Sequence, residues 1–210
     1  MSTPATAPHD MAAKLAARLC HDLIGPVDGL KQGLALLADP AMRDMHKDAM
    51  DLVADSSRRL ETSLTFARAA FGFASDAVSV MSLHSLAEGL FAGHRARLMW
   101  QVDEAELPGP AARALLNLTQ MALAALPYGG QARVAAARSG TGMAVSVSAT
   151  DPRLKLPEAA LGGLTGEAQG EGLAGLWVQG AFLRGAVTSS GGTVGAEATT
   201  EMLSLWAAWT

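Results

Sequence analysis

The sequence contains one cysteine, Cys20, so the chain cannot form an internal disulfide, and a reducing, cytoplasmic compartment is expected. Basic residues are not in excess either: 16 lysines and arginines against 20 aspartates and glutamates give a net charge of −4. Nucleic-acid binders normally carry a basic face, so no nucleic-acid partner is expected. No apolar run approaches the roughly 18 residues of a membrane span, and residues 1–11 lack the basic and apolar regions of a signal peptide. These absences predict a soluble protein with no membrane association.

Apolar residues, in contrast, are plentiful. Half of the 210 residues are hydrophobic and 17% are charged, which is enough to form a packed core in one large domain or two small ones. We see no internal repeat. Changes in composition and apolar periodicity divide the chain into a flexible tail (1–11), a helical hairpin (12–75) and a mixed domain of helices and strands (80–210).

The N-terminal part reads as two helices. Between residues 12 and 38 the large apolar residues recur at intervals of three and four, which is the pattern of one apolar helix stripe. They are Leu15, Leu19, Leu23, Val27, Leu30, Leu34 and Leu37. Asp39-Pro40 ends this helix, and a second one is expected over 41–73. The short connection predicts an antiparallel hairpin, and since a lone hairpin leaves apolar surface in water, we expect two copies to form a four-helix bundle in a homodimer.

The rest of the chain predicts an α+β domain, with antiparallel strands on one side and helices on the other. The expected helices cover 82–97, 110–127 and 173–189. The expected strands cover 98–102, 132–137, 143–149, 193–198 and 202–209. A loop rich in proline and glycine is expected to follow the strand that ends at residue 149 and to continue to about residue 170.

One histidine stands out by its position on the first helix. At about 100° per residue, the stripe lies within roughly 80° of Leu23, whereas His21 lies about 160° away. Arg18, Gly25, Asp28 and Gln32 share its side of the helix, so its neighbours are polar or very small. His21 is therefore expected to face solvent with free space above it.

The residues around His21 suit a nucleophile. Pro26 removes a backbone hydrogen bond to Asp22, which loosens or bends the helix within one turn of the histidine, and Gly25 allows a partner to approach. Neutral imidazole is a good nucleophile near neutral pH, and the adjacent Asp22 could fix its tautomer. A dyad or metal site formed with Cys20 is disfavoured, because adjacent helical side chains diverge and no further ligands cluster nearby.

The stretch 21–26, HDLIGP, resembles the phospho-acceptor box of sensor histidine kinases, and the hairpin resembles their dimerisation and histidine-phosphotransfer domain. The C-terminal part resembles their ATP-binding domain: 113–122 is similar to the kinase Asn box, 170–176 to the glycine-rich box that begins a helix, and 191–193 to the turn after it. With "ARLCHD" and "GEGLAGLWVQ", the whole chain after the tail resembles the ChpT-type histidine phosphotransferases of bacterial phosphorelays.

Departures from the kinase pattern concern the nucleotide site. Met121 stands four residues after Asn117, where the kinases have a second, Mg²⁺-binding asparagine, and a thioether is a poor ligand for a hard cation. The stretch 151–155, DPRLK, replaces the glycine-containing nucleotide box. Glycines 170, 172 and 175 could still form an anion-binding helix start. We therefore expect a degenerate ATPase-like domain that binds neither ATP nor metal, with Mg²⁺ held by a partner.

The resemblance implies a homodimeric histidine phosphotransferase. His21 would accept a phosphoryl group from a receiver-domain aspartate of a hybrid histidine kinase and pass it to a response-regulator aspartate. Asp22 would orient the ring or act as its base, with Arg18, Gly25 and Pro26 in support. Arg18 could neutralise charge that develops on the phosphoryl group. Asp28, Gln32, Arg153 and Lys155 are candidate receiver contacts. The alternatives are an ATP-dependent histidine kinase with an unusual pocket and a non-catalytic dimeric scaffold or kinase inhibitor.

Overall fold

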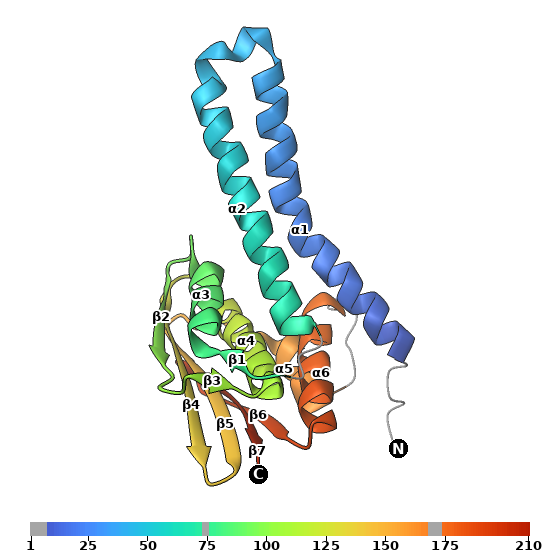
Figure 1. Cartoon of the computed structure of the whole chain (residues 1–210), viewed down its shortest axis with the longest axis vertical. Helices are drawn as coiled ribbons and strands as arrows, with labels where there is room; N and C mark the ends of the chain where they lie inside the picture. Colours follow the sequence, from blue (N-terminus) through green and yellow to red (C-terminus); the bar gives the residue numbers. More distant parts are fainter. Residues whose placement is uncertain (1–7, 73–75, 168–173) are drawn as a thin grey trace.

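The computed structural model describes residues 8–72, 76–167 and 174–210, which form a long helical hairpin beside an α/β domain (Figure 1). The hairpin consists of α1 (Pro8–Ala38), the 3₁₀ helix η1 (Pro40–Met45) and α2 (His46–Phe71). The other helices are α3 (Val80–Phe91), α4 (Gly109–Ala124), α5 (Glu158–Thr165) and α6 (Ala174–Ser189). The strands are β1 (Val78–Ser79), β2 (Ala96–Gln101), β3 (Glu106–Leu107), β4 (Gly130–Ser139), β5 (Gly142–Thr150), β6 (Thr193–Ala198) and β7 (Met202–Trp209). The predicted α+β class and the helical hairpin are confirmed.

Small residues allow the two hairpin helices to pack closely. A Cβ atom on Gly29 would overlap the hydroxyl of the buried Ser56, and one on Gly33 would lie 2.6 Å from Val53 Cγ2. Because no side chain separates the backbones there, the two glycines act as packing positions instead of weak points in α1.

Toward the α/β domain the hairpin opens. Figure 1 shows α1 and α2 side by side near the tip and farther apart at the other end, where α1 contacts α6. α1 continues as one helix through Pro26, which lies between the Gly29 contact with α2 and the Arg18 contact with α6. His21 therefore lies on the part of α1 that departs from its hairpin partner.

A five-stranded sheet forms the base of the α/β domain, in the order β2-β4-β5-β7-β6. Burial alternates along β5 and β7, so one face of the sheet packs into the core and the other stays open. Helices α3 to α6 cover the buried face (Figure 1). The short strands β1 and β3 form a separate antiparallel pair. In the described part of the chain, no helix has both the length and the apolarity to cross a bilayer.

Several local predictions were wrong. Strand β2 pairs with β4 in parallel, not antiparallel, because α4 carries the chain back across the sheet between them. The helix expected over 82–97 ends at Phe91, where the left-handed Gly93 (φ 79°) turns the chain into β2. The second hairpin helix begins at His46, after the 3₁₀ turn. The loop expected after β5 contains helix α5.

The first helix also begins earlier than expected, at Pro8 instead of residue 12. Asp10 lies in the first turn, where it complements the helix dipole, and its carboxylate lies 3.2 Å from Lys14 Nζ. The expected start was set by the spacing of apolar residues, which gives no information about polar interactions such as those of Asp10.

Candidate functional site

His21 projects from α1 into solvent, with 85% of its side chain exposed. This confirms the orientation predicted from the helical wheel. The apolar stripe itself is only partly covered, because Val27 and Leu34 are 40% and 57% exposed. The imidazole can therefore be reached from outside, and the stripe retains apolar surface that α2 does not cover.

Asp22 lies between two nitrogen-containing side chains. Its Oδ1 is 3.5 Å from His21 Nδ1, and its Oδ2 is 3.7 Å from Arg18 Nε. The separation from the imidazole is at the long limit of a hydrogen bond, as expected for adjacent residues that splay apart on a helix. With the carboxylate beside Nδ1, the other ring nitrogen, Nε2, is the one left free to attack an incoming group.

Arg18 is not the solvated helix-surface arginine that its polar side of the wheel suggests. Only 11% of its side chain is exposed, and its Nη1 donates a 2.6 Å hydrogen bond to the carbonyl of Gly175 at the start of α6. Burial lowers the pKa of the Arg18 guanidinium, and the nearby Asp22 carboxylate opposes that shift. The side chain is directed toward α6, which does not favour the predicted role of neutralising charge on the phosphoryl group.

Gly25 and Pro26 lie one turn beyond His21. A Cβ atom on Gly25 would meet nothing within 4 Å, so the helix surface there is open, while Pro26 is partly buried. The space predicted above the histidine is present.

The candidate receiver contacts fall into two groups. Asp28 and Gln32 are exposed on α1, toward the hairpin tip, and Asp28 pairs with Lys31 at 3.6 Å. Arg153 and Lys155 lie on the loop after β5, in the other domain. The two groups are thus on separate parts of the molecule.

The residues that resemble the kinase Asn box are buried in α4. Asn117 is 0% exposed, and its amide donates hydrogen bonds to the carbonyls of Ala70 (2.8 Å) and Arg113 (3.0 Å). Met121 is 1% exposed and belongs to the core. Asn117 holds the end of α2 against α4, and this arrangement does not fit an Mg²⁺-nucleotide, which would need accessible oxygen ligands.

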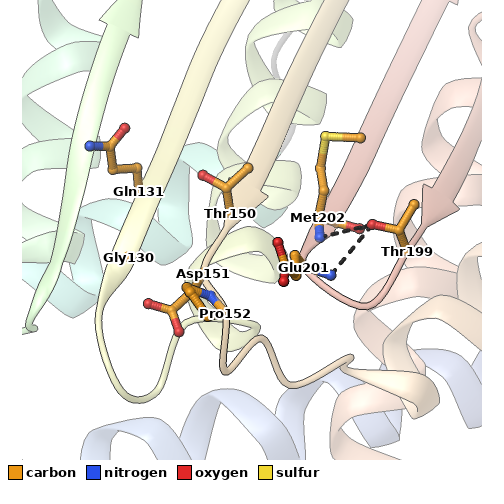
Figure 2. Close-up of a pocket in the computed structure, with 8 residues that line it drawn as sticks. All are labelled: Gly130, Gln131, Thr150, Asp151, Pro152, Thr199, Glu201 and Met202. Carbon is orange, nitrogen blue, oxygen red and sulfur yellow. Dashed lines mark hydrogen bonds between the residues drawn. The ribbon is translucent and has the colours of Figure 1, made fainter.

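The loop that replaces the nucleotide box turns back onto its own domain. Asp151 Oδ1 accepts a 2.7 Å hydrogen bond from the Arg153 backbone, and the Arg153 guanidinium lies over the Tyr128 ring, 5.3 Å from its centroid. The Lys155 backbone N–H donates to the Ala125 carbonyl. Figure 2 shows Asp151 at an open depression where the β6–β7 turn meets the ends of β4 and β5, with the Thr199 hydroxyl bonded within that turn.

Helix α5 occupies the chain between this loop and α6, packing against α6 at glycines. A Cβ atom on Gly163 would overlap the Trp177 carbonyl oxygen, and one on Gly180 would overlap that of Ala160. Gly170 and Gly172, two of the three glycines proposed for an anion site, lie outside the described residues. Within the described ranges, no three histidine, cysteine, aspartate or glutamate side chains gather as metal ligands.

Sequence reasoning missed the contact between α1 and α6. Lys14 Nζ lies over the Trp177 ring, 5.8 Å from its centroid, one turn before the Arg18 contact with Gly175. The four-residue spacing of Lys14, Arg18 and Asp22 marks one helix face in the sequence, but its partner on α6 is more than 150 residues away along the chain.

Comparison with known proteins gives consistent matches. Residues 80–202 match the family model for the histidine phosphotransferase C-terminal domain. Protein phosphotransferase ChpT of Brucella abortus (strain 2308) is 31% identical over 161 residues, which cover 75% of this chain and 76% of that protein.

Solved structures agree. The 1.7 Å structure of a bacterial phosphotransferase superposes with a TM-score of 0.84 and 28% identity, covering 98% of this chain and all of the other. Full-length ShkA in complex with AMPPNP is similar in fold, with a TM-score of 0.51 and 19% identity over 96% of this chain and 45% of that one.

Proposed function

Because the chain belongs to the histidine phosphotransferase family and is a phosphotransferase of a phosphorelay, we propose that His21 is the residue that carries the phosphoryl group. The observation that supports this choice is the 85% exposed imidazole on α1, beside a carboxylate and free of bulky neighbours. A receiver domain could place its phosphoaspartate over this ring without any rearrangement of the helix.

In the proposed reaction, the lone pair of His21 Nε2 attacks the phosphorus of an aspartyl phosphate. The bond between phosphorus and the aspartate oxygen breaks, and the receiver carboxylate leaves with the electron pair. The ring then carries the phosphoryl group on Nε2 and a proton on Nδ1, where Asp22 stabilises the positive charge. Transfer to a second receiver's aspartate is the reverse reaction.

Positioning and charge neutralisation dominate phosphoryl transfer, and we assign the Mg²⁺ ion to the receiver. The buried Asn117 and Met121 support this division, because neither presents a ligand to a nucleotide-bound cation. The ATP-dependent kinase alternative is therefore not favoured. Asp28 and Gln32 remain proposed receiver contacts on the exposed side of α1, and Arg153 and Lys155 on the loop after β5.

We further propose that two hairpins pair into a four-helix bundle. Large apolar side chains remain exposed on both hairpin helices, and a second copy would cover them. They are Ile24, Val27 and Leu34 on α1, and Met50 and Leu64 on α2. The proposal includes a cytoplasmic location, because the receivers that it requires act there.

The test is a transfer assay with two phosphoryl donors. The purified protein is mixed with a ³²P-phosphorylated receiver domain and, separately, with labelled ATP and Mg²⁺. Acid-labile label from the receiver alone, absent in His21→Ala, is the expected result. Label from ATP alone would instead indicate a kinase. A wild-type protein that takes up no label from either donor, with receiver binding unchanged in His21→Ala, would indicate a scaffold.

A further inference from the structure

The face of α1 that meets α6 carries three charged side chains at four-residue intervals: Lys14, Arg18 and Asp22. Lys14 lies over Trp177, and Arg18 donates to the Gly175 carbonyl. Asp22 comes last in this row, with its Oδ2 3.7 Å from Arg18 Nε, and it is also the neighbour of His21. The row therefore joins the α/β domain to the proposed acceptor.

We propose that Arg18 is a positioning residue, which is held by the Gly175 carbonyl on α6, fixes the Asp22 carboxylate, and through it orients the His21 imidazole. The inference rests on the proposed function only for its effect on transfer rate. Its structural part, the orientation of the ring, stands on the contacts alone.

Exposure distinguishes the anchor from the group that it holds. The Arg18 side chain is 11% exposed, that of Asp22 42%, and that of His21 85%. A half-exposed carboxylate with no anchor would sample several rotamers, and Asp22 and His21 splay by about 100° on the helix. The charge of Arg18 near Oδ2 selects the rotamer that turns Oδ1 toward His21 Nδ1.

Two nitrogens of the guanidinium face the two partners. Nη1 donates a 2.6 Å hydrogen bond to the Gly175 carbonyl, whereas the buried Nε makes no hydrogen bond to the described residues and attracts Asp22 Oδ2, 3.7 Å away, through charge alone. The planar guanidinium spreads its charge over both positions, whereas an ammonium group offers a single point of charge. The contact between α1 and α6 thereby helps to set the geometry of the proposed acceptor, His21.

The consequence is a specific tautomer. With Asp22 turned toward it, Nδ1 keeps the proton and Nε2 is free for attack. ¹⁵N NMR of the His21 imidazole reports the fraction of the Nδ1–H tautomer directly, without any phosphoryl donor, while rapid-quench transfer from a phosphorylated receiver reports the rate. Arg18→Gln removes the charge and, because glutamine is shorter, also the Nη1 hydrogen bond to Gly175, whereas Arg18→Lys keeps the charge.

We expect Arg18→Gln to lower the Nδ1–H fraction and to slow transfer about tenfold, since small misplacements of a reacting group cost one to two orders of magnitude. Arg18→Lys should recover part of both. In a double-mutant cycle, Arg18→Gln with Asp22→Asn should be no slower than Asp22→Asn alone, because one residue acts through the other. Circular dichroism melting confirms that each variant is folded.

Lys14→Gln is the matched control, because it loosens the same contact between α1 and α6 about two turns away from Asp22. Its tautomer fraction and rate should stay within twofold of the wild type. An Arg18→Gln effect that adds to that of Asp22→Asn, an unchanged tautomer, or an equal loss in Lys14→Gln would each overturn the inference. A wild-type protein that accepts no phosphoryl group would refute the proposed function instead, and the tautomer measurement would still decide the role of Arg18.

Discussion

The imidazole of His21 and the carboxylate of Asp22 are the two side chains on which the proposed chemistry depends. One is almost fully exposed, and the other is shared with a buried arginine. Exposure gives a receiver access to the nucleophile, and the arginine limits the freedom of the carboxylate. Both properties are needed, because a nucleophile that is accessible but free to rotate loses the advantage of pre-orientation.

Replacing His21 should abolish phosphoryl transfer, since no other group in the proposed mechanism accepts the phosphoryl group. We expect His21→Ala to take up no acid-labile label from a phosphorylated receiver. His84→Ala serves as control: that imidazole is 39% exposed and stacks on Trp100 in the α/β domain. Undiminished labelling of the His21 variant would place the acceptor elsewhere.

Replacing Asp22 should slow transfer without preventing it. Asp22→Asn removes the charge that holds the Nδ1 proton, and we expect a loss of about 10²-fold in the single-turnover rate. Asp55→Asn, which removes an exposed aspartate paired with Arg58 on α2, should stay within twofold. Equal rates for the two variants would mean that Asp22 has no part in orienting the ring.

The exposed histidine and its carboxylate could be recognised from sequence because helical geometry links residues that are neighbours along the chain. The role of Arg18 could not. Its guanidinium packs against Gly175, and sequence periodicity carries no information about contacts between distant segments.

Helices α5 and α6 of the α/β domain are joined by contacts at the level of the backbone. Gly163 of α5 and Gly180 of α6 let the two helices touch through carbonyl oxygens and amide nitrogens. The prolines and glycines around α5 predict a loop, but in the folded protein Gly163 serves helix packing. A glycine in a short apolar stretch can therefore belong to a loop or to a close contact between helices, and only the packing of the neighbouring helix decides which.

Two alanine substitutions on α6 compare a glycine at the helix contact with a glycine that has open space around it. In Gly180→Ala the new methyl group would overlap the Ala160 carbonyl and lie 2.6 Å from the Leu164 nitrogen, so we expect a loss of about 2 kcal/mol in unfolding free energy. In Gly185→Ala the methyl group meets nothing within 4 Å, and the better helix propensity should add about 0.5–1 kcal/mol. Urea unfolding measures both, and a Gly180→Ala protein as stable as the wild type would contradict the close packing.

Asn117 offers a test of the joint between the hairpin and the α/β domain. Asn117→Ala removes the donor to the Ala70 carbonyl, and we expect it to lower the unfolding free energy by about 1–3 kcal/mol. Phosphoryl transfer below the unfolding transition should stay within twofold, since the amide touches neither His21 nor Asp22. A folded Asn117→Ala protein with a large loss of transfer would give this residue a role beyond structure.

The whole molecule places an extended hairpin at one end and the α/β domain at the other, with α1 in contact with both α2 and α6 (Figure 1). His21 lies where α1 passes from one contact to the other. A receiver that docks on this exposed side would therefore meet a helix whose position depends on two neighbours.

The proposed dimer predicts that charges on the exposed hairpin surface separate the two copies. Leu34 and Leu64 are 57% and 50% exposed, and replacing both with glutamate would bury two charges from each copy in the bundle. Light scattering should detect a monomer for Leu34→Glu/Leu64→Glu. Met81→Glu, at a 77% exposed methionine on α3, should leave the dimer intact. A wild-type monomer at micromolar concentration would refute the four-helix bundle.

The sequence by itself determined the helical hairpin, the mixed domain and the outward face of His21, because each depends on the periodic placement of apolar residues within one segment. Only the tertiary structure decided the parallel pairing of β2 with β4, the helical state of α5, and the anchoring of Arg18 on α6. Each of these arises from contacts between segments far apart in the chain. Their free energy depends on which surfaces meet, and local periodicity does not contain that information.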